Sequence, residues 1–213
     1  NPYDNRDPRM KYTIVCNEMK WPVDPVEIWE GGTNGLPLQN ATTTGYYLKK
    51  YVNNTISFEA GSTVTKKQHN WVLFRYGEIL LNYAEAMINA FHDPNYKDAV
   101  YNMSAREAVN QIRGRTNISL PGFPSDITEK DFVKRLKNER RVELAFEGHR
   151  FWDVRRWKEL GQTANIYGVK ITKNNEVISY EKFLLETRAV TDNMYFYPIP
   201  NTERFKNPNL GQN

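Results

Sequence analysis

Cysteine, histidine and long apolar runs are scarce in this sequence of 213 residues. Cys16 is the single cysteine, which excludes an internal disulfide framework and any metal site built from several cysteines. The three histidines, His69, His92 and His149, lie far apart, and none has a second ligand at metal spacing. No cofactor is therefore expected. A calcium site made of carbonyl and carboxylate oxygens in the early loops stays open, because such sites leave little trace in a sequence.

The sequence also lacks the motifs of several enzyme and binding classes. It has no Gly-rich phosphate loop, no Gly-x-Ser-x-Gly elbow and no Cys–His pair, and no apolar run approaches the roughly 18 residues that span a membrane. The net charge of +4 is mild, and the basic cluster from Lys134 to Lys158 is interleaved with acidic residues. We therefore expect no nucleic-acid partner.

What the sequence does contain is enough apolar material for a core. With 39% apolar and 25% charged residues it is neither disordered, nor collagen-like, nor a coiled coil. Its length suits one domain or a piece of a larger one. The chain starts at Asn1 without a charged and apolar leader, which favours a mature or excised segment. Thr13–Cys16 lacks the apolar run and small residue of a lipoprotein cleavage box, so we interpret Cys16 as a strand residue.

Three segments differ in pattern. Residues 1–69 are rich in Pro and Gly turns and form an irregular layer, with extended runs at Lys11–Cys16 and Gly45–Val52. Residues 70–160 are helical: apolar spacing and capping residues predict helices over 70–92, 104–116, 128–148 and 151–160. Residues 161–213 hold a hairpin around Asn174-Asn175, a strand at Tyr195–Pro200 and a polar tail. The first two helices form a hairpin of tetratricopeptide size.

Six ordered segments resemble one family. They are Asn5–Arg9 (Asn-Arg-Asp-Pro-Arg), Tyr46–Tyr51, Phe74–Ala86, Val109–Arg115, Glu139–Trp157, and Tyr197–Pro200 together with Asn207–Leu210. In this order they resemble the C-terminal part of a SusD/RagB-type protein, one of the glycan-binding lipoproteins on the outer membranes of Bacteroidetes. The resemblance spans residues 1–213. Gly77 stands where the family more often has Ala, a departure that costs about 1 kcal/mol of helix propensity.

The resemblance implies a mainly α fold, in which tetratricopeptide-like helical hairpins lie beside an irregular layer of loops and short strands. It implies capture of an oligosaccharide (in some members a peptide or glycopeptide) for import through a SusC-like TonB-dependent transporter. It further implies a position on the extracellular face of the outer membrane, held by an N-terminal lipid anchor outside this chain, and no catalysis. An interaction scaffold without a small ligand is the alternative.

Three glutamates four residues apart, Glu139, Glu143 and Glu147, allow two interpretations. Two of them could be the acid and nucleophile of a glycosidase, since that chemistry needs two carboxyl groups a few ångströms apart. Nearby arginines, however, would lower the pKa that a general acid must keep high. We favour structural ion pairs with Arg113, Arg115, Arg155 or Arg156, and this agrees with the resemblance.

Aromatic residues carry the remaining functional signal, because the C–H faces of sugars stack on exposed Trp and Tyr side chains. Trp21 and Trp29 lie in a Pro/Gly-rich loop together with Glu30 and Asn34, and these four are the candidate ligand-binding residues. Trp71, Trp152 and Trp157 are expected in the core. In the family, the main aromatic platform is built from loops upstream of Asn5–Arg9, so most of the ligand site is expected outside this chain.

Overall fold

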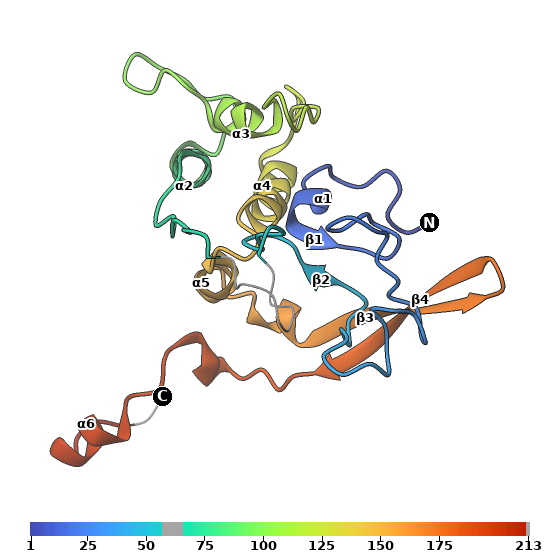
Figure 1. Ribbon diagram of the computed structural model, residues 1–213. Helices are drawn as coiled ribbons and strands as arrows, with labels where there is room; N and C mark the ends of the chain where they lie inside the picture. The colour runs from blue at the N-terminus through green and yellow to red at the C-terminus, as the bar shows by residue number, and fades with distance from the viewer. Residues whose placement is uncertain (57–65, 212–213) are drawn as a thin grey trace. The chain divides into compact units, whose positions relative to one another are not determined.

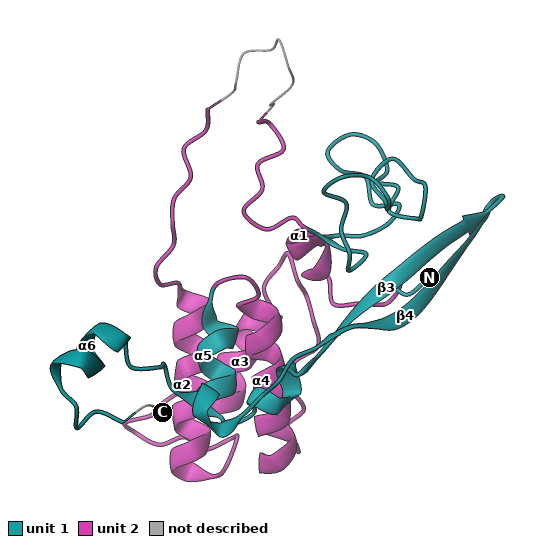
Figure 2. Ribbon diagram, turned by 90° about the horizontal axis from the view of Figure 1, so that it is seen from below, with its two compact units in different colours: residues 1–2, 15–47, 148–213 teal, residues 3–14, 48–147 magenta. Residues whose placement is uncertain are grey.

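A computed structural model describes residues 1–56 and 66–211, and these residues form two compact units. Of the described residues, unit 1 holds 1–2, 15–47 and 148–211, and unit 2 holds 3–14, 48–56 and 66–147 (Figure 2). Two short strands, β1 (Ile14–Val15) and β2 (Tyr47–Leu48), pair in a small sheet of their own.

Unit 2 is built on three helices that pack against one another, α2 (Tyr76–Phe91), α3 (Ala105–Arg113) and α4 (Glu129–Glu143) (Figure 1). A single turn, α1 (Met10–Thr13), belongs to the same unit. Apolar side chains at helical spacing face inward from all three long helices. The most deeply buried are Leu81, Ala84, Ile88, Ala105, Ala108, Val109, Ile112, Phe132 and Leu136. The small alanines allow the backbones to approach closely at these positions.

Side-chain caps mark where α3 and α4 of unit 2 begin. The Ser104 hydroxyl accepts a hydrogen bond from the Glu107 amide, and the Glu107 carboxylate accepts one from the Ser104 amide, which completes a capping box. The Thr128 hydroxyl accepts from the Asp131 amide at the start of α4. These caps satisfy amide groups that have no partner within the helix.

Unit 1 contains the predicted hairpin. Strand β3 (Asn165–Asn174) pairs antiparallel with β4 (Val177–Thr187), and Asn175 takes a left-handed conformation in the turn. Ile171 of β3 packs in a small core with Val15, Val26 and Ile28. The unit also holds α5 (His149–Arg156), α6 (Asn201–Lys206) and two short 3-10 turns, η1 (Leu160–Thr163) and η2 (Asp192–Tyr195). The fold is thus mainly α with few strands, as the sequence predicted.

Several boundaries differ from the sequence expectations. The first long helix starts at Tyr76, and Trp71 lies before it with 74% of its surface exposed, so its assignment to a helical core face was wrong. The helix predicted to reach Gly148 ends at Glu143, and part of the predicted run Lys11–Cys16 is the helical turn α1. Residues 195–200 form no strand, and α6 was missed because its six residues carry no apolar periodicity.

Within residues 1–56 and 66–211, no helix combines the length and the apolar character that a membrane crossing needs.

Candidate functional site

A chain of ion pairs in unit 2 surrounds the end of α4. Glu139 and Glu143 lie on this helix, and Glu147 lies in the turn that follows it. All three side chains are largely buried. The predicted ladder of carboxylate–arginine pairs is therefore present, although Glu147 is past the helix.

Arg9 joins the chain from the Arg-Asp-Pro-Arg segment, far away in sequence. Its guanidinium forms a two-pronged contact with the Asp7 carboxylate, with nitrogen–oxygen distances of 3.0 and 2.6 Å. Its Nη1 donates to Glu139 at 2.6 Å and to Glu143 at 2.8 Å. Burial lowers the pKa of Arg9, but these acidic partners outweigh it, and the pKa lies above its ordinary value.

Arg75 and Lys50 hold Glu147. Arg75 donates from Nε and Nη2 to the two carboxylate oxygens of Glu147, each at 2.7 Å, and Lys50 donates to the same carboxylate at 2.6 Å. Arg75 also donates from Nη1 to the Glu143 carboxylate at 2.7 Å. Such fork-shaped contacts fix geometry as well as charge.

Two arginines, one at the end of α3 and one just after it, complete the network. Arg115 donates to both carboxylate oxygens of Glu143 at 2.9 and 2.8 Å, and Arg113 donates to Glu139 at 2.5 Å. Arg113 and Arg115 are thus confirmed as partners. Arg156 instead pairs with Asp153 at 2.9 Å, and Arg155 donates to the carbonyl of Phe151.

The electrostatics of Glu143 follow from this geometry. Burial raises the pKa of its carboxyl, but hydrogen bonds from Arg75, Arg9 and Arg115 outweigh that effect and lower the pKa from 4.5 to about 2. The pKa of Glu147 is also lowered, because Arg75 and Lys50 outweigh its burial. Both groups are carboxylates at neutral pH.

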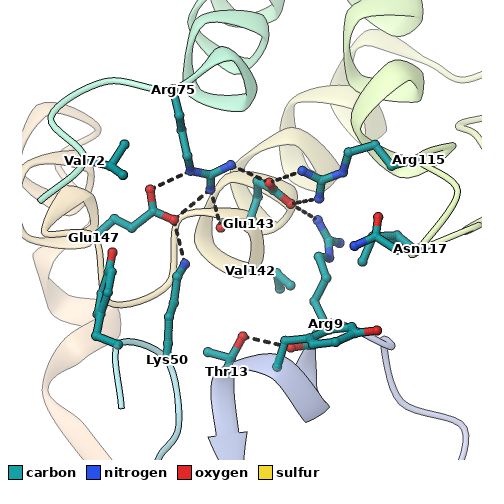
Figure 3. A pocket seen from close by; sticks show the side chains of 13 residues that line it. Arg9, Thr13, Lys50, Val72, Arg75, Arg115, Asn117, Val142, Glu143 and Glu147 are labelled. Atoms are coloured by element: carbon teal, nitrogen blue, oxygen red, sulfur yellow. Dashed lines mark hydrogen bonds and ion pairs between the residues drawn. The ribbon is translucent and has the colours of Figure 1, made fainter. Parts of the chain in front are cut away.

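A cavity of about 370 Å³ opens beside the network (Figure 3). In the close-up, Arg75, Arg115 and Arg9 converge on Glu143, and Lys50 reaches Glu147. The remaining lining side chains are Tyr12, Thr13, Tyr51, Val72, Asn117, Ile118 and Val142. The cavity is thus lined by paired charges together with aromatic, aliphatic and amide side chains.

General acid catalysis is not what this arrangement offers. A glycosidase acid must keep its proton near neutral pH, and a carboxyl held by three guanidinium groups loses it far below that. The structural interpretation of the three glutamates accounts for every contact described for them.

The four residues predicted to bind ligand lie in unit 1. Trp29 is half-buried, and the Lys173 ammonium lies 4.5 Å from its ring centroid. Glu30 is exposed, 3.6 Å from Lys170, and lines a separate cavity of about 170 Å³. Asn34 shapes its own loop: its side-chain oxygen accepts from the Glu27 amide at 3.1 Å. Trp21 is half-buried and packs against the core of Val15, Val26, Ile28 and Ile171.

Trp152 and Trp157, which were expected in the core, are not fully buried. Trp152 has 56% of its surface exposed, and Trp157 is half-buried under the Arg156 guanidinium. The expectation for Trp152 was wrong, because five of the eight residues of α5 are polar or charged and only Asp153 and Val154 are buried.

In the parts of the chain that the structure describes, no three His, Cys, Asp or Glu side chains gather closely enough to hold an ion. Burial raises the pKa of the Cys16 thiol to about 11, so this cysteine stays protonated.

Known proteins resemble this chain over its full length. The model of the SusD family matches residues 1–213. The chain belongs to the SusD family. It is 29% identical to SusD-like protein P2 of Formosa agariphila over 159 residues, which cover 72% of this chain and 27% of that protein. It is 37% identical to SusD-like protein P38 of the same organism over 91 residues, covering 40% and 16%.

Solved structures agree with the family assignment. A SusD-like protein of Bacteroides fragilis superposes with a TM-score of 0.77 at 27% identity, over 99% of this chain and 39% of that chain. A second structure, BT4246, gives a TM-score of 0.74 at 25% identity, over 98% and 36%. The chain thus spans less than half the length of these SusD-like proteins.

Sequence reasoning missed three members of the network, Arg9, Arg75 and Lys50. Their glutamate partners lie between 68 and 134 residues away in the chain, beyond the reach of local spacing rules. A signal was present, however. All three lie inside segments that carry the SusD resemblance, Asn5–Arg9, Tyr46–Tyr51 and Phe74–Ala86.

Proposed function

We propose that this chain is part of a surface nutrient-binding protein that captures an oligosaccharide for a SusC/SusD-type uptake system. The observation that carries the proposal is the match of the SusD family over all 213 residues. SusD-family proteins are generally nutrient-binding components of such systems. The transporter partner, a SusC-like TonB-dependent barrel, and the outer-membrane location on a lipid anchor outside this chain belong to the same proposal.

The state of Glu143 and Glu147 favours binding over cleavage at the end of α4. Glu143 and Glu147 are engaged by cations and have lowered pKa values. A protein that hands its ligand to a transporter has no need to cleave it, and modest affinity in the micromolar to millimolar range allows release.

For ligand contacts within this chain we propose the loop that holds Trp21, Trp29, Glu30 and Asn34. Trp29 offers a ring face that Lys173 partly covers, and Glu30 offers an exposed carboxylate beside the cavity of unit 1. Asn34 and Trp21 would act mainly by holding the loop in shape, given their contacts.

One observation favours a second function, binding of another protein without a small ligand. Before and at the start of α2, Trp71, Leu73, Phe74 and Tyr76 each expose more than two thirds of their surface. Exposed apolar patches of this kind mark interaction surfaces. Capture of a peptide or glycopeptide would use the same chemistry.

Calorimetry on the intact protein, together with co-purification of the transporter, separates these functions. Neutral and acidic oligosaccharides are titrated into the wild type, Trp29→Ala and Trp71→Ala, and any sugar that binds is then tested for hydrolysis. The proposal expects sugar binding, no hydrolysis, and an effect of Trp29→Ala alone. Loss of transporter co-purification in Trp71→Ala, with no sugar bound by the wild type, would support the scaffold function instead.

A further inference from the structure

A group of aromatic rings in unit 1 lies outside the sites described so far. Phe151 and Trp152 of α5 lie with ring centroids 5.1 Å apart, in an edge-to-face arrangement. Tyr197, which follows η2, lies 5.6 Å from Phe151 and 5.7 Å from Trp152. The three rings therefore hold one another in fixed orientations, at distances typical of favourable aromatic pairs.

These rings remain open to solvent although they are fixed. Trp152 exposes 56% of its surface, Tyr197 62% and the neighbouring Phe196 71%. Phe151 is backed by the Arg155 guanidinium, whose carbon lies 3.5 Å from the ring centroid. A rigid, exposed aromatic wall is a feature of ligand-binding surfaces more than of a packed core.

Polar groups stand around this wall in a cavity of about 850 Å³, a size usual for ligand sites. It is lined by Trp152, Arg155, Arg156, Lys158, Asp192, Tyr195, Phe196 and Tyr197. Within the described residues, the side chains of Asp192 and Lys158 make no hydrogen bond or ion pair. Arg155 uses one of its nitrogens, Nη1, on the Phe151 carbonyl and keeps other donors.

We propose that this cavity is a saccharide-binding platform, a deepening that rests on the nutrient-capture function above. A pyranose ring has an apolar C–H face that would lie on Trp152 and Tyr197. Its hydroxyl groups would donate to the Asp192 carboxylate and accept from Lys158 and Arg155. The aromatic rings and the charged hydrogen-bonding groups together supply the amphipathic surface that a sugar requires. Because the rings are already held in place, binding loses little side-chain entropy.

The charge of the cavity sets what sugars it takes. Arg156 is already paired with Asp153, which leaves Arg155, Lys158 and Asp192 as the other charged residues that line the cavity. The platform therefore accepts neutral oligosaccharides and has one surplus positive charge for a uronate. Neutral sugars and uronates share the apolar pyranose face and the vicinal hydroxyl groups. Comparing the affinities of a neutral and an acidic oligosaccharide therefore shows whether the surplus charge contributes.

The test is a calorimetric titration of the intact protein with maltohexaose, cellohexaose, xylohexaose and hexagalacturonate. Two variants probe the platform, Tyr197→Ala for the ring wall and the isosteric Asp192→Asn for the polar rim. Phe205→Ala is the matched control, because Phe205 is 85% exposed and lines none of the cavity. Thermal melts of all variants verify folding.

We expect at least one hexasaccharide to bind, with affinity reduced about tenfold by Tyr197→Ala and several-fold by Asp192→Asn, and unchanged by Phe205→Ala. If hexagalacturonate bound more strongly than the neutral sugars, and if added salt weakened its binding, the surplus positive charge would be shown to contact the uronate. Sugar binding that neither variant alters would overturn the platform and leave nutrient capture intact. Failure of all four sugars to bind would count against both the platform and the proposed function.

Discussion

Arg75 and Glu143 are joined twice, although 68 residues separate them. Nη1 of Arg75 donates to the Glu143 carboxylate and Nη2 donates to the Glu143 backbone carbonyl, each at 2.7 Å. The carbonyl belongs to the last residue of α4, and Arg75 immediately precedes α2. One guanidinium thus caps the end of one helix, neutralises its carboxylate and anchors the start of another.

The Arg75–Glu143 pair explains why a glycine suits position 77. A Cβ atom built at Gly77 would lie 2.7 Å from Nη1 of Arg75 and 3.3 Å from a carboxylate oxygen of Glu143. We predict that Gly77→Ala destabilises the protein by about 1–2 kcal/mol, because displacing the buried ion pair outweighs the gain in helix propensity. Urea denaturation measures it, with Gly161→Ala as the control, since no atom lies within 4 Å of a Cβ there. A more stable Gly77→Ala variant would mean that the pair shifts at no cost.

Glu143→Gln tests the network directly. The variant keeps the shape of the side chain but leaves Arg9, Arg75 and Arg115 without their shared charge, so we predict a loss of about 3 kcal/mol in unfolding free energy. Glu203→Gln, which removes an exposed pair with Lys206, should change stability by less than about 1 kcal/mol. Equal effects of the two changes in chemical denaturation would contradict a structural role for the buried carboxylate.

The same carboxylate predicts how stability depends on pH. The pKa of Glu143 is lowered from 4.5 to about 2 in the folded protein, so the unfolded state takes up its proton first as pH falls. The stabilisation is complete above about pH 4.5 and is lost as the pH falls through 2. We expect the wild type to lose stability more steeply than Glu143→Gln between these values. Parallel stability curves would show that the folded and unfolded pKa values are alike.

Much of the helical layer was predictable because its signals are local. Ser104 with Glu107 and Thr128 with Asp131 mark the starts of α3 and α4, and both caps are made as the spacing indicates. The Asn174-Asn175 turn likewise predicted the hairpin. Local signals failed at Trp71, where aromatic residues continue a helical rhythm that the backbone does not follow.

The candidate sites were less predictable, because their members are brought together by the tertiary fold. Arg9 meets Glu139 across 130 residues, and no spacing rule connects them. Trp152 and Tyr197 lie 45 positions apart in the sequence. From its neighbours in the sequence, Trp152 was predicted to lie in the core and Tyr197 in a strand. Their contact arises only because the segment after η2 packs on α5. Arg113 and Arg115 were among the four arginines predicted as carboxylate partners, and they pair with Glu139 and Glu143.

The helices of unit 2 pack closely around Ala84. Ala84 of α2 is completely buried in the core that α2, α3 and α4 share, whereas Ala90, on the same helix, is exposed. Ala84→Leu adds three carbon atoms where no space exists, and we predict a loss of about 1–3 kcal/mol. Ala90→Leu adds the same atoms in solvent, and since Ala and Leu have similar helix propensities it should be nearly neutral. Thermal melts of the two variants isolate the packing contribution from propensity. If Ala84→Leu melted at the wild-type temperature, α2 would not be held as closely as the burial of Ala84 indicates.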